Sequence, residues 1–327
     1  MNELERSLAY VPSDADITEL KGLPSGKLPS FSVVIPSFNQ ATFLRQTIDS
    51  VFSQEYPNME VFVADGGSKD GSLPILEEYS RKYPNILRFD SRPDGGHRHG
   101  VNKGIASTSG DIVAWINSDD VYLPGAFWKV AAFFYYNRVA FVVYGRNRYV
   151  DRDLNPVIDY PVDWSPLLSE QKRRMMHFCL VPQPSLFFRR MAVTLCGALN
   201  SNIVDYELWL RWQKDLPFYF CDDYLSLSRL HDNAITANAD RRLLREICET
   251  VHLYYRAVPF SWAFRYAYTA VHGAAWTRGE SPDIGLKVHI LARWYWVEMN
   301  LRWLPRMAWR AAQALVAWFD QVCRIAS

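Results

Sequence analysis

The sequence predicts an α/β fold built on an open, mostly parallel sheet that is flanked by helices. Two observations predict it: short apolar runs alternate with helix-length segments from residue 31 onward, and polar residues gather directly after those runs. Alternating strand and helix patterns are typical of βαβ units, whose strands lie parallel. With 327 residues, of which 49% are hydrophobic and 22% charged, the chain can form one large domain with appendages.

The first half of the sheet is predicted from four apolar runs, FSVVI, MEVFVA, ILRF and DIVAWI, which begin at residues 31, 59, 86 and 111. Helices are expected between them, around 40–53, 71–83 and 97–107. Ligands bind beyond the carboxyl ends of parallel strands. The polar loops PSFNQ, ADGGSKDG, SRPDGGH and NSDD that follow these runs are therefore predicted to form the binding site.

The second half of the chain predicts a mixed arrangement. A helix is expected after Leu123, then FVVYG and RNRYV as two strands, a less regular stretch with several prolines, and a helix from DYELWLRW onward. Beyond about Asp240, where seven of the twelve tryptophans fall, we expect mostly helix. The expected domains are a loose, polar N-terminal arm over 1–30, the α/β domain over 31–239 and a helical region rich in Trp and Arg over 240–327.

Charge and cysteine content exclude several classes of protein. The net charge of +1 gives no field for sequence-independent binding of nucleic acid, so nucleic acid is not an expected partner. The five cysteines are scattered and form no Cys-x-x-Cys pair, which favours a reducing cytoplasm over a disulfide framework or a zinc site. The N-terminus lacks the pattern of a signal peptide, and no apolar stretch reaches about 18 residues.

The segment NSDD places two carboxylates, Asp119 and Asp120, after the buried-looking run DIVAWI. Adjacent carboxylates repel each other unless a cation or hydrogen-bond donors stabilise them. Mg²⁺ or Mn²⁺ prefers such oxygen ligands together with phosphate oxygens and water. The alternative for Asp120 is an exposed helix N-cap ahead of VYLPGAF.

The segment VADGGSKDGS lacks the G-x-G-x-x-G pattern of dinucleotide-binding loops, so a Rossmann dehydrogenase is disfavoured. Asp65 at the strand end, followed by Gly66, suits a carboxylate that accepts a hydrogen bond from a ring N–H of a closely bound ligand. The alternative is an Asp-Gly turn that caps the next helix.

Taken together, the segments FSVVIPSFNQ, VADGGSKDGS, RPDGGHRHGVNKGIASTSGDIVAWINSDDVYLPGA and DYELWLR resemble the successive motifs of family 2 glycosyltransferases with the GT-A fold. The resemblance covers about 200 residues. It implies an inverting transferase whose general base is Asp205, whose metal ligand is Asp119, and which uses a sugar nucleotide, with a UDP-sugar as the expected donor. The residues that it implies for binding the nucleotide sugar are Pro36, Ser37, Asn39, Asp65, Gly66, Gly96, Asn117 and Ser118.

Two positions depart from the family pattern. Asn117 stands where the first acid of Asp-x-Asp is usual, and it can still hydrogen-bond a ribose hydroxyl. His99 stands where many relatives carry an acid, so His97, Arg98 and His99 either face a diphosphate or form a solvated helix start.

Further site residues are proposed from weaker resemblances. SLSRLHDNAIT resembles the Arg-x-His segment that closes the donor site, so His231 is either a ligand of the diphosphate or metal or a structural residue. Gln183 of QPS, Glu207 and Trp209 are expected on the acceptor side. In a helix that starts here, Glu207 lies about 200° round the axis from Asp205, so only one of them can face the acceptor. The resemblance selects Asp205 as the base, and the alternative for Asp205 is a helix cap.

Two other functions stay open on the sequence. A sugar-phosphate nucleotidyltransferase would need a basic, Gly-rich loop after the first strand, which PSFNQ is not. A degenerate, non-catalytic scaffold would have little reason to keep Asp65, Asp119 and Asp205.

The segment RMAWRAAQALVAWFDQVCR predicts an amphipathic C-terminal helix that binds a membrane surface or a partner, or packs on the catalytic domain. Its polar positions are Arg306, Arg310, Gln313, Asp320 and Arg324, and its apolar positions are Ala311, Leu315, Trp318, Phe319 and Val322. The expected acceptor is a carbohydrate or lipid-linked molecule of surface polysaccharide or glycolipid synthesis. The expected location is cytoplasmic, with peripheral attachment to the inner face of the membrane.

Overall fold

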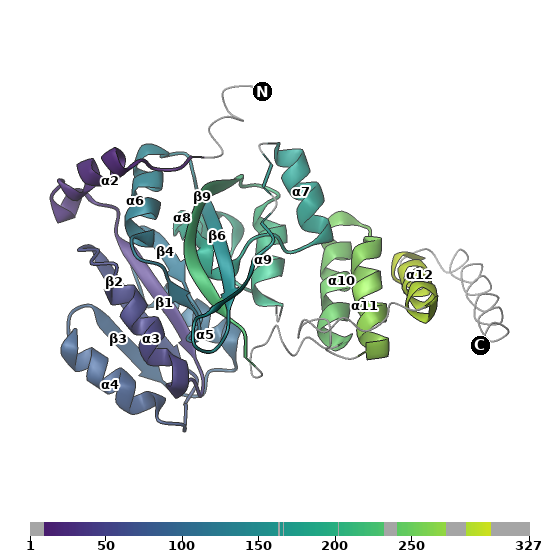
Figure 1. The fold of residues 1–327 in the computed structure, drawn as a ribbon, viewed down its shortest axis with the longest axis horizontal. Coiled ribbons are helices and arrows are strands. Elements are labelled where there is room, and N and C mark those ends of the chain that lie inside the picture. Colours follow the sequence, from purple (N-terminus) through teal and green to yellow (C-terminus); the bar gives the residue numbers. More distant parts are fainter. Residues whose placement is uncertain are drawn as a thin grey trace. The chain divides into compact units, whose positions relative to one another are not determined.

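The computed structural model describes residues 10–162, 164–165, 167–201, 203–231, 241–272 and 286–301. The chain forms two compact units, one from residues up to 172 together with 180–230, the other from 173–179 together with the chain from 231. The first is an α/β domain and the described part of the second is helical (Figure 1). The C-terminal amphipathic segment predicted over 306–324 lies outside the described residues.

The α/β domain is organised around one nine-stranded sheet in the described residues. Its strands, in spatial order, are β3 (Leu87–Ser91), β2 (Met59–Asp65), β1 (Phe31–Ser37), β4 (Ile112–Trp115), β8 (Leu186–Arg189), β6 (Val142–Val150), β9 (Phe218–Arg229) and β5 (Val121–Tyr122), with β7 (Pro156–Asp159) paired to β6. β1 to β4 are parallel, and β6 and β9 run with them because β8 is antiparallel to both β4 and β6. The predicted mostly parallel sheet is confirmed.

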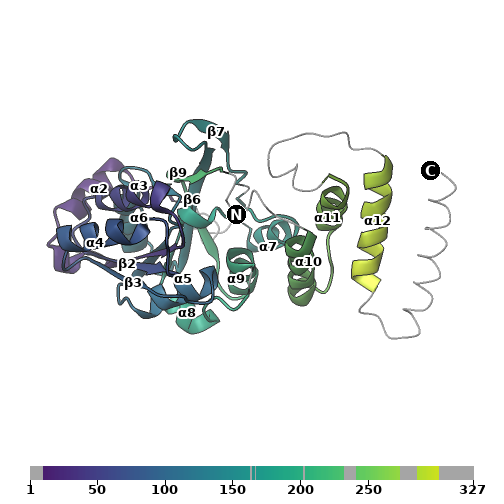
Figure 2. The same ribbon diagram turned by 90° about the horizontal axis from the view of Figure 1, so that it is seen from below.

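Helices cover both faces of this sheet. Figure 2 shows α3, α4 and α6 on one side of β2 and β3, with α5 and α8 on the other. Their bounds are α3 (Ala41–Phe52), α4 (Ser72–Lys82), α5 (His97–Ala106), α6 (Ala126–Tyr136) and α8 (Met191–Cys196), followed by α9 (Val204–Trp212). The helices expected around 40–53, 71–83 and 97–107 are therefore present.

β1 is the centre of the core because all seven of its residues are buried. Phe31 stacks on Phe127 of α6 with ring centroids 4.8 Å apart, and Phe187 of β8 packs edge-on against both rings. On the other face, α5 approaches β1 closely at Gly104, where an added Cβ would lie 2.3 Å from Val34 Cγ1. This close approach brings the start of α5 to the sheet edge that carries the polar loops.

The expected loose arm is wrong for residues 10–30. The short helix α2 (Asp14–Lys21) begins with a capping box in which Ser13 and Asp16 bond reciprocally, and Leu20 and Leu28 are buried in the core of the domain. The Ser-x-x-Asp spacing is the sequence signal for this helix start. The polar composition of the segment hides the two buried leucines.

The two strands expected from FVVYG and RNRYV form the single strand β6. Its pairing with β9 shifts register on either side of Arg146, next to Gly145. A Cβ at Gly145 would lie 2.5 Å from the Leu225 side chain, so glycine is required here by close strand packing. The glycine lies opposite a bulge of β9, where Cys221 and Tyr224 pair with consecutive residues of β6, and it does not end β6.

The connection from β4 to β5 crosses the sheet. β4 lies in the middle of the strand order and β5 at one end, yet only residues 116–120 separate them in the chain. Those residues include the acidic segment NSDD. The acidic turn therefore lies at the carboxyl end of β4, beside the amino end of the antiparallel β8, and Asp120 bonds to Arg229 at the end of β9.

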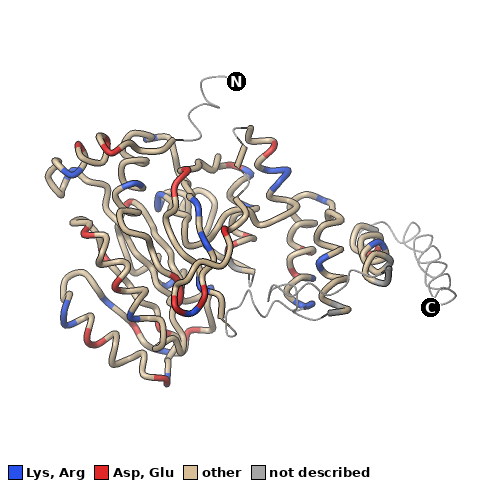
Figure 3. Tube along the Cα trace, in the orientation of Figure 1, with Lys and Arg blue, Asp and Glu red and all other residues tan. Residues whose placement is uncertain are grey.

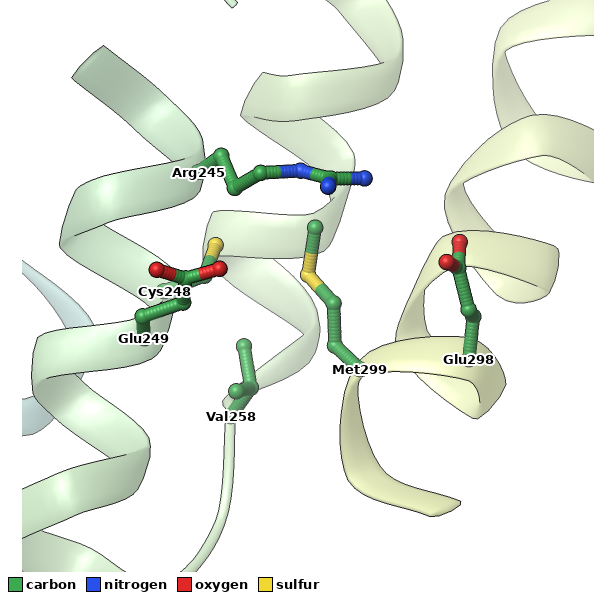
Figure 4. A pocket seen from close by; sticks show the side chains of 6 residues that line it. All are labelled: Arg245, Cys248, Glu249, Val258, Glu298 and Met299. Atoms are coloured by element: carbon green, nitrogen blue, oxygen red, sulfur yellow. The ribbon is translucent and has the colours of Figure 1, made fainter. Parts of the chain in front are cut away.

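The second unit contains the end of α7 (Leu168–His177) and the helices α10 (Arg241–Tyr255), α11 (Phe260–His272) and α12 (Leu286–Leu301). Trp262 donates a hydrogen bond to the Met176 carbonyl, and Asn300 exchanges two hydrogen bonds with the Val258 backbone. A small hollow here is lined by Arg245, Cys248, Glu249, Val258, Glu298 and Met299 (Figure 4). None of the predicted site residues lines it.

The helices in the described part of the chain are not long and apolar enough for any of them to cross a membrane. Basic and acidic segments are interspersed along the trace (Figure 3), as the near-zero net charge requires.

Candidate active site

The carboxyl ends of the first three strands lie in one row. Ser37 of β1 pairs with Asp65 of β2, which pairs with Ser91 of β3. Pro36 and Ser37 both lie in the fully buried strand β1. The hydroxyl oxygen of Ser37 is buried and has no hydrogen-bond partner among the described residues. An unpartnered buried hydroxyl is uncommon, and here it lies at the sheet edge where a ligand is expected.

Asp65 is fully buried and accepts hydrogen bonds from several donors around it. Its Oδ2 accepts from the Gly67 and Ser68 amides and from the Ser91 hydroxyl, and its Oδ1 accepts from the Ser68 hydroxyl. The carboxylate thus fixes the turn that contains Gly66 and Gly67. Its Oδ1 carries one hydrogen bond against three on Oδ2.

The loops after β1 and β2 are bonded to each other. Asn39 adopts a left-handed conformation with φ of 52°, its amide donates to the Ser68 hydroxyl at 2.7 Å, and its Oδ1 accepts from the Lys69 amide at 2.9 Å. The Ala41 amide at the start of α3 donates to Asp70 at 2.8 Å. These hydrogen bonds hold the loops after β1 and β2 together as one rigid edge of the candidate site. The side-chain oxygen of Asn39 is already used in one of them.

Phe38 is the exposed side chain of this edge, with 60% of its surface accessible. Its ring lies over Gly66, where an added Cβ would come within 3.2 Å of it. The residue is absent from the candidates drawn from the sequence. The signal that could have found it is a large aromatic residue in a polar loop directly after a strand.

The loop after β3 leads into α5 through two glycines with positive φ, Gly95 and Gly96. The Gly96 amide donates to Asp94 at 2.9 Å, and Gly96 is the N-cap of α5. A Cβ at Gly96 would meet nothing within 4 Å, so its surroundings are open. Glycine is required here by backbone conformation.

The acidic turn holds its two carboxylates in different surroundings. Asp119 is partly exposed, whereas Asp120 is buried and accepts hydrogen bonds from the Arg229 amide at 3.0 Å and the Asn117 side-chain amide at 3.5 Å. Burial, followed by the charge of Asp119, raises the pKa of Asp120 well above its ordinary value. Ser118 is buried.

The helix N-cap alternative for Asp120 is wrong. Asp120 is followed by β5, and the next helix, α6, has Gly125 as its N-cap. The Thr47 hydroxyl of α3 also donates to the Asp120 carbonyl at 2.7 Å. Asp120 therefore joins the turn to α3 and β9 and is not a surface cap.

Arg229 is a functional candidate that the sequence did not single out by itself. Its guanidinium is buried over the Phe43 ring at 4.4 Å and donates to Gln46 through Nη2, while Nε and Nη1 have no partner. Burial lowers the pKa of Arg229, and the charges of Asp120 and Asp119 partly offset this. A buried cation with two unused N–H groups beside two carboxylates suits an anionic ligand.

The start of α9 carries Asp205, whose Oδ1 accepts from the Tyr206 amide at 2.8 Å. Burial raises the pKa of Asp205; the hydrogen bond from Tyr206 and the charge of His97 partly offset this. A carboxylate with a raised pKa is a better proton acceptor than an ordinary one.

Glu207 and Trp209 point into the protein. Glu207 is 3% exposed and forms a two-point ion pair with Arg211, with Nε to Oε1 at 2.8 Å and Nη2 to Oε2 at 3.2 Å. Arg211 in turn donates to the carbonyls of residues 196–198. Trp209 is fully buried against Trp115 and Trp212. Neither Glu207 nor Trp209 is exposed to an acceptor in this structure.

Gln183 lies in the short 3-10 turn Gln183–Ser185 and is 8% exposed. Its amide nitrogen donates to the Trp115 carbonyl at 2.7 Å, and its Oε1 is buried without a partner. The turn is thereby tied to the end of β4, directly before Asn117.

The segment His97 to His99 makes contacts within the protein. His97 Nε2 lies 2.8 Å from Asn117 Oδ1, Arg98 donates to the Asn200 carbonyl at 2.7 Å, and His99 Nδ1 lies 3.0 Å from the Gly95 carbonyl. Helix α5 thus contacts both the acidic turn, through His97, and the segment before α9, through Arg98.

Metal binding in this structure would depend on few protein ligands. Among the described residues, no three His, Cys, Asp or Glu side chains form a group that could hold a metal ion. Asp119 and Asp120 would therefore need oxygens from a ligand to complete a coordination shell. His231 is buried and belongs to the second compact unit.

Residues 32–194, about half of the chain, match the family model described as Glycosyl transferase family 2. The chain carries a glycosyl transferase family 2 domain. The matched range includes the loops with Ser37, Asp65 and Asn117, and Asp205 lies beyond it. This family match favours the glycosyltransferase over the nucleotidyltransferase alternative.

Curated relatives of the glycosyltransferase domain are similar over part of their length. An uncharacterized glycosyltransferase of Rickettsia felis is 27% identical over 218 residues, which is 62% of this chain and 34% of that protein. A chondroitin synthase of Escherichia coli is 28% identical over 195 residues, 59% of this chain and 28% of that protein. The chain thus spans about a third of the length of these two relatives.

Solved structures share the fold of the glycosyltransferase domain. Residues 1–349 of S. aureus TarS, in complex with UDP-GlcNAc, match with a TM-score of 0.57 at 17% identity over 85% of this chain and 82% of that one. The mannosyltransferase PcManGT from Pyrobaculum calidifontis, in complex with GDP-Man and Mn²⁺, matches with a TM-score of 0.55 at 14% identity over 94% and 85%. The predicted GT-A fold is confirmed.

Proposed function

We propose that the domain transfers a sugar from a nucleoside diphosphate sugar to an acceptor hydroxyl with inversion at the anomeric carbon. The observation that supports this most is that helix α5 contacts both segments: His97 lies 2.8 Å from Asn117 of the acidic turn, and Arg98 and Asn102 donate to the backbone just before α9, which carries Asp205. Direct displacement needs a base and a diphosphate site on opposite sides of one carbon atom. The acidic turn and the start of α9 therefore have to lie close together, and their contacts with the same helix, α5, support this.

On the donor side, we propose that the nucleoside binds along the rigid edge formed by the first two loops. The exposed ring of Phe38 offers a surface for a base to stack on, and the adjacent Gly66 leaves room beside it. Asp65 Oδ1 keeps acceptor capacity for a ring N–H, and the unpartnered Ser37 hydroxyl can bond a ribose. Pro36, Asn39 and Gly96 shape this edge. We propose a UDP-sugar as the first donor to test; on the same fold, TarS holds UDP-GlcNAc and PcManGT holds GDP-Man.

For the diphosphate, we propose a divalent cation held by Asp119, with Asp120 beside it. The residues fit such an ion, because burial and the neighbouring charge of Asp119 make the ionised form of Asp120 unfavourable unless a positive charge lies nearby. When bound, Mn²⁺ or Mg²⁺ would offset the charge that develops on the leaving diphosphate. Arg229 can donate its two unpartnered N–H groups to the same anion.

Asp205 is the base that we propose for the acceptor hydroxyl. An alcohol is a weak nucleophile at neutral pH, so a carboxylate within hydrogen-bond reach must accept its proton during attack. The raised pKa of Asp205 favours that role, whereas the carboxylate of Glu207 is already held in a two-point ion pair with Arg211. Glu207 supports the loop over 196–198. Gln183 would lie on the acceptor side, whereas Trp209 is buried against Trp115 and Trp212.

We propose an acceptor of surface polysaccharide or glycolipid synthesis, since a chondroitin synthase is among the relatives. The catalytic domain would be 31–239, and the helical region 240–327 would attach the protein to the inner face of the membrane. Support comes from Trp and Arg enrichment in 240–327 and from the exposed Trp296. Liposome flotation of the full chain against a chain ended near residue 240 tests this, and equal flotation of both would refute it.

The experiment that tests the reaction is a donor screen. Purified protein with Mn²⁺ is incubated with UDP-, GDP- and dTDP-sugars, and thermal shift and released nucleoside diphosphate are measured. The true donor at a hundred times its Kd should stabilise the fold by about 2.7 kcal/mol. Asp119→Ala is the matched control, expected to lose hydrolysis. Absence of both stabilisation and hydrolysis with every donor would contradict the proposal.

A further inference from the structure

The turn after β6 places an arginine at the ligand-binding edge of the sheet. β6 ends beside β9, where Val150 pairs with Arg229 and its carbonyl accepts a hydrogen bond of 2.8 Å from the Leu230 amide. Because β6 and β9 run in the same direction as β1 and β4, the residues after Val150 lie at the same edge as the acidic turn. Arg152 is the second residue after β6.

Two guanidinium groups gather at one aromatic ring. The guanidinium carbon of Arg229 lies 4.4 Å from the centroid of the Phe43 ring, and that of Arg152 lies 5.4 Å from it. Arg229 is 3% exposed, whereas Arg152 is exposed and makes no ion pair with the described residues. Two positive charges near one ring repel each other, so their arrangement favours an anion beside them.

The buried arginine keeps unused hydrogen-bonding capacity. Arg229 Nη2 donates to Gln46 at 2.8 Å, but Nε and Nη1 are buried without a partner among the described residues. Burial lowers the pKa of Arg229, and the charge of Arg152 lowers it further, against the opposite effect of Asp120 and Asp119. The two arginines are thus close enough to act on each other through their charges, and Arg152 is the one that faces solvent.

Resting on the proposed function, we propose that Arg152 is a further donor-binding residue, whose guanidinium contacts the diphosphate of the nucleotide sugar while Arg229 adds its charge from the buried side. A planar guanidinium can bond two phosphate oxygens at once. The backbone of the turn holds Arg152 in place, because Asp151 Oδ1 accepts from the Asp153 and Asn155 amides at 2.9 Å each.

A diphosphate could come from the donor or from a lipid-linked acceptor. The contacts favour the donor, because Arg229 also donates through its amide to Asp120 Oδ1 at 3.0 Å. Asp120 belongs to the acidic turn that we assign to the leaving diphosphate. The Phe43 ring lies on the first turn of α3, directly after the loop that we assign to the nucleoside. The two arginines therefore lie between the proposed sites for the two ends of a nucleoside diphosphate.

Calorimetric titration with pyrophosphate and with UDP, each in the presence of Mn²⁺, tests this role. Arg152→Gln removes the charge and keeps a polar side chain, and Arg152→Lys keeps the charge without the planar fork. Arg138→Gln is the matched control. Arg138 is also exposed and its guanidinium lies 5.7 Å from the Tyr135 ring, but it precedes β6 and so lies at the opposite end of that strand. The Tm of each variant verifies that it is folded.

We expect Arg152→Gln to weaken binding of pyrophosphate and UDP about tenfold, as for the loss of one hydrogen bond to a charged group. Arg152→Lys should lose less, Arg138→Gln should match the wild type, and the loss should shrink at high salt. An Arg152→Gln protein that binds pyrophosphate within twofold of the wild type overturns the inference, as does a wild type that does not bind pyrophosphate.

A further arm separates the two sources of the diphosphate. If Arg152→Gln weakens pyrophosphate binding only when UDP already occupies the protein, Arg152 serves the acceptor and the inference is overturned. Pyrophosphate carries neither base nor sugar. A failed donor screen would therefore refute the proposed function and leave the pyrophosphate titration valid.

Discussion

The Arg229 amide donates a hydrogen bond of 3.0 Å to Asp120 Oδ1. This bond joins the end of β9 to the acidic turn that follows β4, two segments more than a hundred residues apart in the chain. Because the same residue also places its buried guanidinium beside Asp119 and Asp120, β9 supplies both a hydrogen bond and a positive charge to the carboxylates. The turn and the end of β9 are thus held together by both a hydrogen bond and opposite charges.

Asp119→Ala should reduce turnover by at least a hundredfold, because the variant loses the carboxylate that we assign to the divalent cation. Release of nucleoside diphosphate over a Mn²⁺ titration measures this. Chelation of the wild type with EDTA should have the same effect, and added Mn²⁺ should restore only the wild type. Turnover that survives both treatments would show that the cation assignment is wrong.

Asp120→Asn should stabilise the metal-free protein at neutral pH. The folded pKa of Asp120 is raised, so the folded state binds a proton more readily than the unfolded chain, and stability falls as pH rises above the unfolded value near 4. Asparagine can still accept from the Arg229 amide but carries no charge. The Tm of the variant should exceed that of the wild type at pH 7.5 and approach it near pH 4. A lower Tm at pH 7.5 would count against this account.

Asp205→Asn should abolish transfer while leaving donor binding within twofold of the wild type. Asparagine keeps an oxygen for the Tyr206 amide and removes a carboxylate whose pKa is raised by burial, so the Tm at neutral pH should be equal or higher. Calorimetric titration with nucleoside diphosphate and a transfer assay measure the two properties. Transfer within a few-fold of the wild type would remove Asp205 as the base.

Glu207→Ala should destabilise the fold by about 3 kcal/mol, because it leaves the Arg211 guanidinium without its partner in a buried ion pair. Urea unfolding gives the free energy of unfolding. Replacement of the exposed Glu78, whose ion pair with Arg45 is on the surface, is the control and should destabilise the fold much less. Equal losses in the free energy of unfolding at the two positions would show that the Glu207–Arg211 ion pair does not stabilise the fold more than a surface pair.

Gly104→Ala should destabilise the domain by about 1–3 kcal/mol, since the new methyl group would overlap Val34 Cγ1 at 2.3 Å. Gly26→Ala is the matched control, because a Cβ there meets nothing within 4 Å, and it should change stability by less than about 0.5 kcal/mol. Thermal unfolding of both variants compares them. An unchanged Tm for Gly104→Ala would mean that α5 can move away from β1 at little cost.

The alternation of apolar runs and polar loops was enough to predict the parallel half of the sheet and to place Asp65 and Asp119 at its edge. That inference works because strand order along a βαβ chain decides which loops meet. The residues that sequence reasoning missed depend on tertiary contacts. Phe38 is notable only because it is exposed, and Arg229 only because two of its N–H groups are buried without partners.

Local signals were misread where one residue type serves two purposes. Gly145 resembles a strand end but allows close packing of Leu225 within a continuous strand. The polar segment before residue 30 conceals Leu20, which has no accessible surface. His97 could not be separated from Arg98 and His99 in the sequence, because only the fold brings Asn117 to its ring.

The short crossing from β4 to β5 has a consequence for how the domain unfolds. Three strands lie between β4 and β5 in the sheet order, yet the five intervening residues contain a tight turn in which the Asp120 amide donates to the Asn117 carbonyl at 3.2 Å. The sheet must therefore curl so that β5 comes back toward the end of β4. This short connection joins the early strands to the last ones, so we expect one cooperative unfolding transition, with the Asn117–Asp120 turn among the last parts to lose protection from hydrogen exchange.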